Sequence, residues 1–203
     1  MTHKAVLFGS AARGNADANS DYDILLMLDE PPVSAQLLRD EVSKALGRKA
    51  GVSIYTEKRL RQLWEQGSLF AWHLHTEARA LDGFDSSFLA ALGAPAPYTK
   101  ARTDIKMMTE IIFAASEQIR IGSLSKCYEA GLLYVGSRNV GMYASTKISG
   151  RLDFGRYAPY ALEPTIPFPL EKQRYDLLVG CRHASTRGHA APIMDKVVLK
   201  IDA

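Results

Sequence analysis

The chain has 203 residues, of which 47% are hydrophobic and 23% charged, an ordinary composition for a soluble globular protein. No apolar run approaches the roughly 20 residues that span a bilayer, which argues against a membrane-spanning helix, and the run at 5–8 is too short for the core of a signal peptide. The net charge of +3 says little about partners. We therefore expect a cytoplasmic protein without a membrane partner.

Charge is distributed unevenly along the chain. Through Tyr98 there are 10 Lys and Arg against 12 Asp and Glu, a net charge of −2, and from Thr99 onward there are 15 against 10, a net charge of +5. A basic second half suits a position near phosphates, and an ordinary solvated surface explains it equally well. The two cysteines, Cys127 and Cys181, lie far apart in the sequence without metal-ligand spacing. We interpret them as reduced cysteines packed in apolar surroundings.

The first half alternates short apolar runs with helical patterns. Buried strands are predicted at 4–8, 24–28 and 51–55. Ser34 can cap a helix that runs to about residue 46. Residues 57–66 are expected to be helical, and a helix or a strand follows at about 69–81. This alternation predicts an α/β domain with a small sheet.

The Gly-Ala-Pro-Ala-Pro segment at 93–97 breaks this pattern, and we predict two domains, 1–95 and 99–203. Beyond the break, apolar residues from Ile105 to Ile119 step by three and four, which predicts an amphipathic helix. Gly122 ends that helix and Ser123 can cap the next.

The rest of the second half is also predicted to be mainly helical. An apolar stripe from Leu124 through Tyr128 to Met142 indicates a second helix. After an irregular stretch with four prolines at 150–169, a third helix is expected at about 170–183. Residues 193–201 fit either a helix or a strand. The second domain is therefore predicted to be an all-α helical bundle.

A Gly-Ser turn and a pair of carboxylates are the residues in the sequence that most clearly indicate a chemical function. Gly9-Ser10 leaves the first predicted strand and enters a predicted helix, whose N-terminal N–H groups, beside the serine hydroxyl, form a site for phosphate oxygens. Asp21 and Asp23 open the second strand, and alternate strand residues share a face. Two carboxylates on one face would hold Mg²⁺ against a nucleoside triphosphate.

This segment resembles the signature of the DNA polymerase beta-like minimal nucleotidyltransferases: Gly-Ser, ten residues, then Asp-x-Asp. The ten residues here are 11–20, and Gly14, Ser20 and the apolar run after Asp23 match as well. The resemblance covers roughly residues 4–82. It implies an α/β (α+β) nucleotidyltransferase fold with a small mixed sheet, followed here by the helical lobe.

The resemblance also implies roles for individual residues. Asp21 and Asp23 would be the catalytic carboxylates and would bind one or two Mg²⁺ ions. The nucleotide-binding residues would be Gly9, Ser10, Arg13 and Ser20. The implied reaction moves a nucleoside monophosphate from a nucleoside triphosphate, with ATP the expected donor, to an acceptor hydroxyl and releases pyrophosphate. A protein side chain, an RNA end or a small molecule would serve as acceptor.

The sequence departs from the family pattern at one position. Active members usually carry a third carboxylate on the next strand, between apolar residues, and Ser53 occupies that place. A serine hydroxyl is a poor general base and carries no negative charge for a metal. Two explanations are open. The domain is a degenerate nucleotide-binding regulatory or antitoxin-like protein, or another acid such as Glu57 or Glu77 reaches the site.

The helical partners of these nucleotidyltransferases often resemble HEPN domains, and a helical protein partner would fit the antitoxin-like alternative. Some HEPN domains are ribonucleases with an Arg, four to six residues and a His. Arg182 and His189 match this spacing only loosely, and Gly188 is expected to break the helix between them. The spacing fits chance or a phosphate contact better than a ribonuclease.

Two other polar groups are ambiguous. Arg138-Asn139 and the segment 153–157 either line a cleft that faces the nucleotide or belong to a helix surface and a tight loop. His73 and His75 lie beside Trp72 without a third ligand at useful spacing, which favours packed or surface histidines over a metal site.

Overall fold

The computed structural model describes residues 4–16, 21–47 and 50–192. The chain divides into two compact units, unit 1 at residues 1–99 and unit 2 at residues 100–203, and each is described by itself. Among the described residues, no helix combines the length and the apolar character that crossing a bilayer requires.

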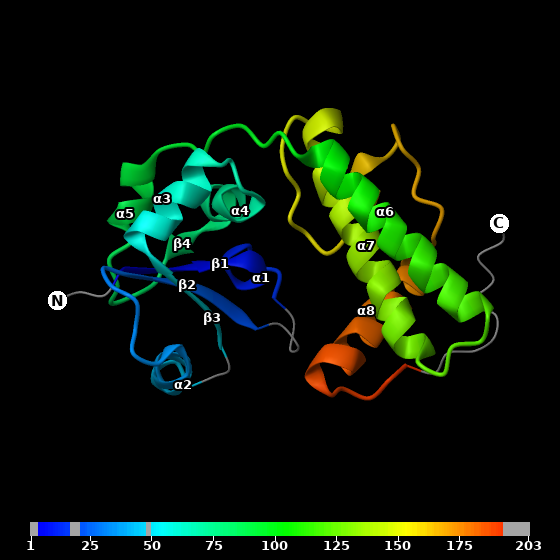
Figure 1. The fold of residues 1–203 in the computed structure, drawn as a ribbon, viewed down its shortest axis with the longest axis horizontal. Coiled ribbons are helices and arrows are strands. Elements are labelled where there is room, and N and C mark those ends of the chain that lie inside the picture. Colours follow the sequence, from blue (N-terminus) through cyan, green and yellow to red (C-terminus); the bar gives the residue numbers. More distant parts are fainter. Residues whose placement is uncertain (1–3, 17–20, 48–49, 193–203) are drawn as a thin grey trace. The chain divides into compact units, whose positions relative to one another are not determined.

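Unit 1 is built on a four-stranded mixed sheet with the strand order β3-β2-β1-β4 (Figure 1). β1 (Lys4–Phe8) pairs antiparallel with both β2 (Tyr22–Leu28) and β4 (Arg79–Ala80), whereas β2 pairs parallel with β3 (Ala50–Thr56). A parallel pair needs a crossover connection, and α2 (Ala35–Ala45) supplies it. The predicted α/β fold with a small mixed sheet is confirmed.

Helices cover both faces of this sheet (Figure 1). On one face Ile24 and Leu26 pack beneath α2, which begins where the Ser34 hydroxyl accepts a hydrogen bond from the Leu37 N–H at 3.3 Å. On the other face Leu25 and Met27 pack with residues of α3 (Glu57–Glu65), α4 (Leu69–Glu77) and α5 (Ser87–Leu92). The strands therefore have two buried faces, which explains their continuous apolar runs.

The segment at 69–81, for which the sequence allowed a helix or a strand, contains both. The Ser68 hydroxyl accepts from the Ala71 N–H at 3.1 Å and caps α4, and the short strand β4 follows at Arg79. The proline-rich segment at 93–97 is held against unit 1. The indole N–H of Trp64 donates to the Gly93 carbonyl at 2.9 Å, and that of Trp72 donates to the Ala96 carbonyl at 3.0 Å.

Unit 2 is helical, which confirms the predicted character of the second half. Its elements are α6 (Ala101–Arg120), α7 (Lys126–Ile148), the short 3₁₀ helix η1 (Tyr160–Leu162) and α8 (Lys172–Arg187) (Figure 1). α7 packs against both α6 and α8, and two glycines permit the close approach. A Cβ on Gly136 would press on Ile112 of α6, and one on Gly131 would lie 3.1 Å from the Arg182 Cα of α8.

Two details of unit 2 differ from the sequence interpretation. α7 has Ser125 at its N-cap instead of Ser123, whose hydroxyl accepts from the Ser125 N–H at 3.1 Å. Leu124 and Tyr128, assigned to the apolar stripe, are exposed; Leu124 precedes α7 and Tyr128 lies in its first turn. The predicted element at 193–201 lies outside the described residues.

The packing of α7 on α8 also brings the two cysteines together. Cys127 Sγ lies 3.7 Å from the Cys181 carbonyl oxygen. Neither cysteine forms a disulfide, and Cys181 is fully buried and Cys127 partly buried, in agreement with the interpretation of reduced cysteines.

Candidate functional site

Asp21 and Asp23 stand where β2 begins. Tyr22 is the first residue of the strand, so Asp21 immediately precedes it and Asp23 is the second residue within it. Asp23 is paired with Phe8 of β1 and Gly51 of β3. By strand alternation its side chain shares the sheet face that carries Leu25 and Met27 and lies beneath α3 and α4.

Two glycines make room for the Asp23 carboxylate. Gly9 has a φ of +71°, and a Cβ built on it would overlap Asp23 Oδ2. A Cβ on Gly51 would lie 3.2 Å from Asp23 Oδ1. The carboxylate therefore lies directly against backbone on both neighbouring strand ends, an approach that a side chain at residue 9 would block.

The helix expected after the Gly-Ser turn is a single turn, α1 (Gly9–Ala12). It closes with hydrogen bonds from the Arg13 N–H to the Gly9 carbonyl and from the Asn15 N–H to the Ser10 carbonyl, both at 3.1 Å. The predicted nucleotide-binding residue Ser20 lies outside the described residues. Of the described parts of the motif, the structure brings Gly9 and Asp23 into contact and places Ser10 and Arg13 within the same turn.

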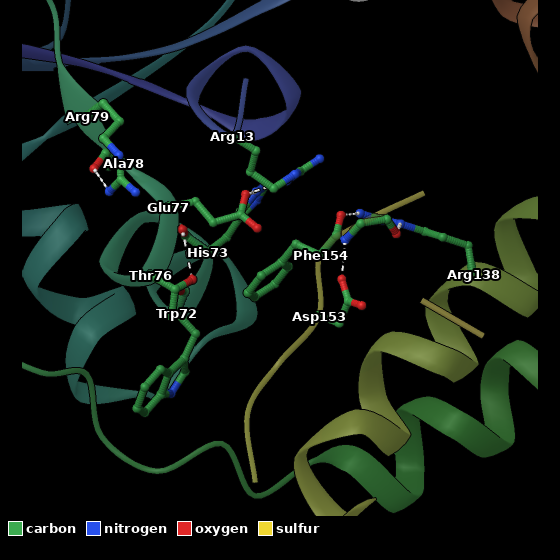
Figure 2. Close-up of polar contacts among 11 residues, drawn as sticks. Arg13, Trp72, His73, Thr76, Glu77, Ala78, Arg79, Arg138, Asp153 and Phe154 are labelled. Carbon is green, nitrogen blue, oxygen red and sulfur yellow. Dashed lines mark hydrogen bonds and ion pairs between the residues drawn. The ribbon is translucent and has the colours of Figure 1, made fainter. Parts of the chain in front are cut away.

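Arg13 forms an ion pair with Glu77 near the C-terminal end of α4, as Figure 2 shows. The same Glu77 oxygen, Oε2, lies 2.8 Å from His73 Nε2 one helical turn earlier. All three side chains are largely buried, with exposed fractions of 24%, 12% and 18% for Arg13, Glu77 and His73. The His73 ring stands edge-on to Phe8, with centroids 5.3 Å apart, and Phe8 is the β1 partner of Asp23. We call these three residues the Arg13–Glu77–His73 network.

Glu77 is ionised in this network at neutral pH. Burial raises the pKa of its carboxyl, but hydrogen bonds and charge interactions with His73 and Arg13 outweigh burial and hold the pKa below its ordinary value of 4.5. The (i, i+4) spacing of His73 and Glu77 can be read from a helix pattern. Their connection to Arg13, 64 residues from Glu77, has no sequence signal and was missed.

The motif geometry agrees with a match to known proteins. Residues 2–74 match the family model described as "Nucleotidyltransferase domain". Residues 2–74 of unit 1 are thus similar to nucleotidyltransferase domains. The match includes the Gly-Ser turn, both aspartates and β3, and it ends within α4. It is consistent with the polymerase beta-like resemblance, and it supports nucleotidyl transfer as the general activity of the unit. A search of curated proteins gave no match to this chain.

Ser53 stands where the polymerase beta-like resemblance leads us to expect a third carboxylate. In the β2–β3 ladder, Asp23 pairs with Gly51 and Leu25 pairs with Ser53. Because side chains alternate along a strand, Ser53 lies on the same sheet face as Asp23, two residues further along the strands. Glu57 cannot replace a carboxylate there. It follows Thr56 at the other end of β3, about 20 Å along the strand from Gly51, and it pairs with Arg61 and Lys4.

Glu77 lies on the correct face, but its charge is already matched by Arg13. Within the described ranges, no group of three or more His, Cys, Asp or Glu side chains is arranged to hold a metal ion. The arrangement thus offers the Asp23 carboxylate against a glycine turn, with Asp21 two residues earlier in the chain, and a largely buried Arg13–Glu77 ion pair that starts from the same turn.

The polar clusters of unit 2 have structural partners. The Arg138 guanidinium donates to the carbonyl oxygens of Phe154 at 2.6 Å and Gly155 at 3.4 Å (Figure 2). Asp153 Oδ1 accepts from the Gly155 N–H at 2.7 Å. These contacts fasten the loop that follows α7.

The Arg182 and His189 pair does not share a continuous helix. α8 ends at Arg187 because Gly188 adopts a left-handed conformation with a φ of +70°, and the His189 ring lies 5.8 Å from that of His183. His75 is exposed and its ring stands edge-on to Trp72, with ring centroids 5.7 Å apart, so it is a surface histidine.

Proposed function

We propose that unit 1 is a Mg²⁺-dependent nucleotidyltransferase that moves a nucleoside monophosphate, with ATP the expected donor, to an acceptor hydroxyl and releases pyrophosphate. One observation carries the proposal. In a domain that matches the nucleotidyltransferase family, the backbone of Gly9 lies directly against the carboxylate of Asp23. This juxtaposition would bring the phosphates of a nucleotide at the turn to a metal-binding carboxylate.

The chemistry of the donors fits Mg²⁺. This ion is usually bound by one or two carboxylates together with substrate phosphates and water, so it does not need a cage made by the protein alone. Asp21 and Asp23 would supply the carboxylates, and Gly9 and Gly51 place backbone without a Cβ against the Asp23 carboxylate. The bound ion would neutralise phosphate charge while the displacement proceeds.

The turn after β1 would bind the triphosphate. Gly9 presents backbone without a Cβ, Ser10 supplies a hydroxyl, and Arg13 supplies a permanent positive charge. Ser20 would complete the set. With the triphosphate held there, the acceptor oxygen bonds to the α-phosphorus as the bond from that phosphorus to the bridging oxygen of pyrophosphate breaks, and the hydroxyl proton passes to solvent water. Positioning and charge neutralisation account for most of such catalysis.

A second candidate function rests on Ser53. Because Ser53 shares the sheet face of Asp23 and cannot act as a base, unit 1 could bind a nucleotide as a regulatory protein without transferring it. Loss of general-base assistance alone typically slows an enzyme by about 10²–10⁴-fold. The two candidates therefore differ in turnover and not in nucleotide binding.

The test uses the full chain with each of the four nucleoside triphosphates labelled at the α-phosphate, in Mg²⁺ and then in Mn²⁺. Labelled products and pyrophosphate are quantified for the wild type, Asp23→Asn and Ser53→Asp. Turnover that Asp23→Asn abolishes supports the transferase. Metal-dependent binding without turnover, together with a gain of turnover in Ser53→Asp, supports the degenerate regulator. Absence of both binding and turnover contradicts the proposed function.

A further inference from the structure

The Arg13–Glu77–His73 network is a buried charge arrangement that the proposed reaction does not explain. A partly buried carboxylate costs free energy unless it is paired, and this one is shared between a cation on the α1 turn and a histidine on its own helix. The single oxygen Oε2 serves both partners, so removing Glu77 would leave the Arg13 charge without its carboxylate.

The network is fixed to the strand end that carries the candidate site. His73 packs on Phe8, which pairs with Asp23 across the β1–β2 ladder. The backbone N–H of Arg13 donates a hydrogen bond to the Gly9 carbonyl. Glu77 therefore connects α4 to the turn whose glycine lies against the Asp23 carboxylate, and a shift of Arg13 would move that turn.

The Arg13 side chain keeps a partly exposed end. Its terminal nitrogen Nη1 pairs with Glu77, its Nε–H is buried without an acceptor among the described residues, and about a quarter of the side chain is exposed. A guanidinium held in place by one carboxylate keeps further donors in a planar fork, the geometry that phosphate oxygens prefer.

We propose that Glu77 is a positioning residue that, supported by His73, holds the Arg13 guanidinium and the Gly9-Ser10 turn in the arrangement that binds the triphosphate. This inference rests on the proposed function. Glu77 acts through Arg13 and contacts no metal. In the rival role, Glu77 would replace the carboxylate missing at Ser53. It would then have to break its ion pair with Arg13 and bind Mg²⁺ instead.

The experiment measures equilibrium binding of ATP, GTP, CTP, UTP and inorganic tripolyphosphate to the full chain at several Mg²⁺ concentrations. Glu77→Gln retains the shape of the side chain and removes its charge, and Glu57→Gln is the matched control because Glu57 is an ion-paired carboxylate at the far end of β3. We expect Glu77→Gln to weaken the binding of both the best-bound nucleotide and tripolyphosphate by about tenfold or more, because the variant loses a hydrogen bond between charged groups. The Mg²⁺ concentration that gives half-maximal nucleotide binding should stay the same. Glu57→Gln should bind as the wild type does.

A charge exchange separates positioning from simple stabilisation. The double variant Arg13→Glu, Glu77→Arg preserves an ion pair between α1 and α4 but puts a carboxylate on the turn. We expect it to melt within a few degrees of the wild type and to lose tripolyphosphate binding. Normal binding by either Glu77→Gln or the double variant would overturn the inference. A changed Mg²⁺ concentration at half-maximal nucleotide binding in Glu77→Gln would also overturn it, in favour of a metal ligand. If the wild type binds no nucleotide, the proposed function itself fails.

Discussion

Replacing Gly9 by alanine should damage both the stability of unit 1 and its binding of nucleotide. The structure supplies a matched control in Gly14, because both glycines have left-handed φ angles, +71° for Gly9 and +74° for Gly14. Their surroundings differ. A Cβ at residue 9 overlaps the Asp23 carboxylate, whereas a Cβ at residue 14 has nothing within 4 Å.

The magnitude follows from this difference. An L-residue in the left-handed region costs about 1–2 kcal/mol, and this cost applies to both variants. Inserting a methyl group where atoms already fill the space typically costs a further 1–3 kcal/mol, and it applies only to Gly9→Ala. We therefore expect a loss of about 1–2 kcal/mol of unfolding free energy for Gly14→Ala and about 2–5 kcal/mol for Gly9→Ala.

Urea unfolding followed by tryptophan fluorescence measures this loss selectively, because both tryptophans, Trp64 and Trp72, lie in unit 1. Nucleotide binding by the folded variants is measured in parallel. Gly9→Ala should lose Mg²⁺-dependent binding because the carboxylate is displaced, and Gly14→Ala should keep it. Equal destabilisation by the two substitutions, or unchanged binding in Gly9→Ala, would refute the close approach of Gly9 to Asp23.

Three further predictions concern packing and ionisation. Gly141→Ala should destabilise unit 2 more than Gly136→Ala in far-ultraviolet circular dichroism melts. The methyl group at residue 141 meets the backbone of Pro159, whereas that at residue 136 meets first the movable side chain of Ile112. Equal losses of stability would contradict this. Iodoacetamide at pH 8 should label the partly exposed Cys127 in the native chain and should label Cys181 only after unfolding, as read by mass spectrometry. The reason is that burial and the neighbouring Cys127 raise the pKa of Cys181 to about 12. The pKa of Glu77 lies below 4.5 in the folded state, so its stabilising effect is present above pH 4.5 and is lost as the pH falls through the folded pKa. Glu77→Gln should therefore reduce the fall in unfolding free energy of unit 1 at acid pH. A loss of unfolding free energy that is the same at every pH would count against the ion pair.

The sequence was most informative where local patterns decide the structure. The strands at 4–8 and 51–55 and the helix capped by Ser34 follow from apolar runs and cap residues, and all three are present. The motif spacing predicted that the Gly-Ser turn and Asp23 would share one site. Pairing of Asp23 with Phe8, the residue before Gly9, produces their contact.

The sequence was less informative where distant segments meet. Glu57 and Glu77 were equivalent as substitute acids until the sheet placed Glu57 at the far end of β3 and the fold paired Glu77 with Arg13. Cys127 and Cys181 meet only because α7 packs on α8. Each of these outcomes depends on contacts across many residues, for which no local signal exists.

The central claim, that Asp23 and the Gly9-Ser10 turn form a site for a nucleoside triphosphate and Mg²⁺, is tested most directly by equilibrium binding of ATP, GTP, CTP and UTP with and without Mg²⁺. The variant Asp23→Asn removes one carboxylate charge from the site. Asp29→Asn is its matched control, an exposed aspartate just beyond the opposite end of β2. We predict Mg²⁺-dependent binding of at least one nucleotide by the wild type and by Asp29→Asn, and its loss in Asp23→Asn. Binding that persists in Asp23→Asn, or absence of binding in the wild type, would contradict the account.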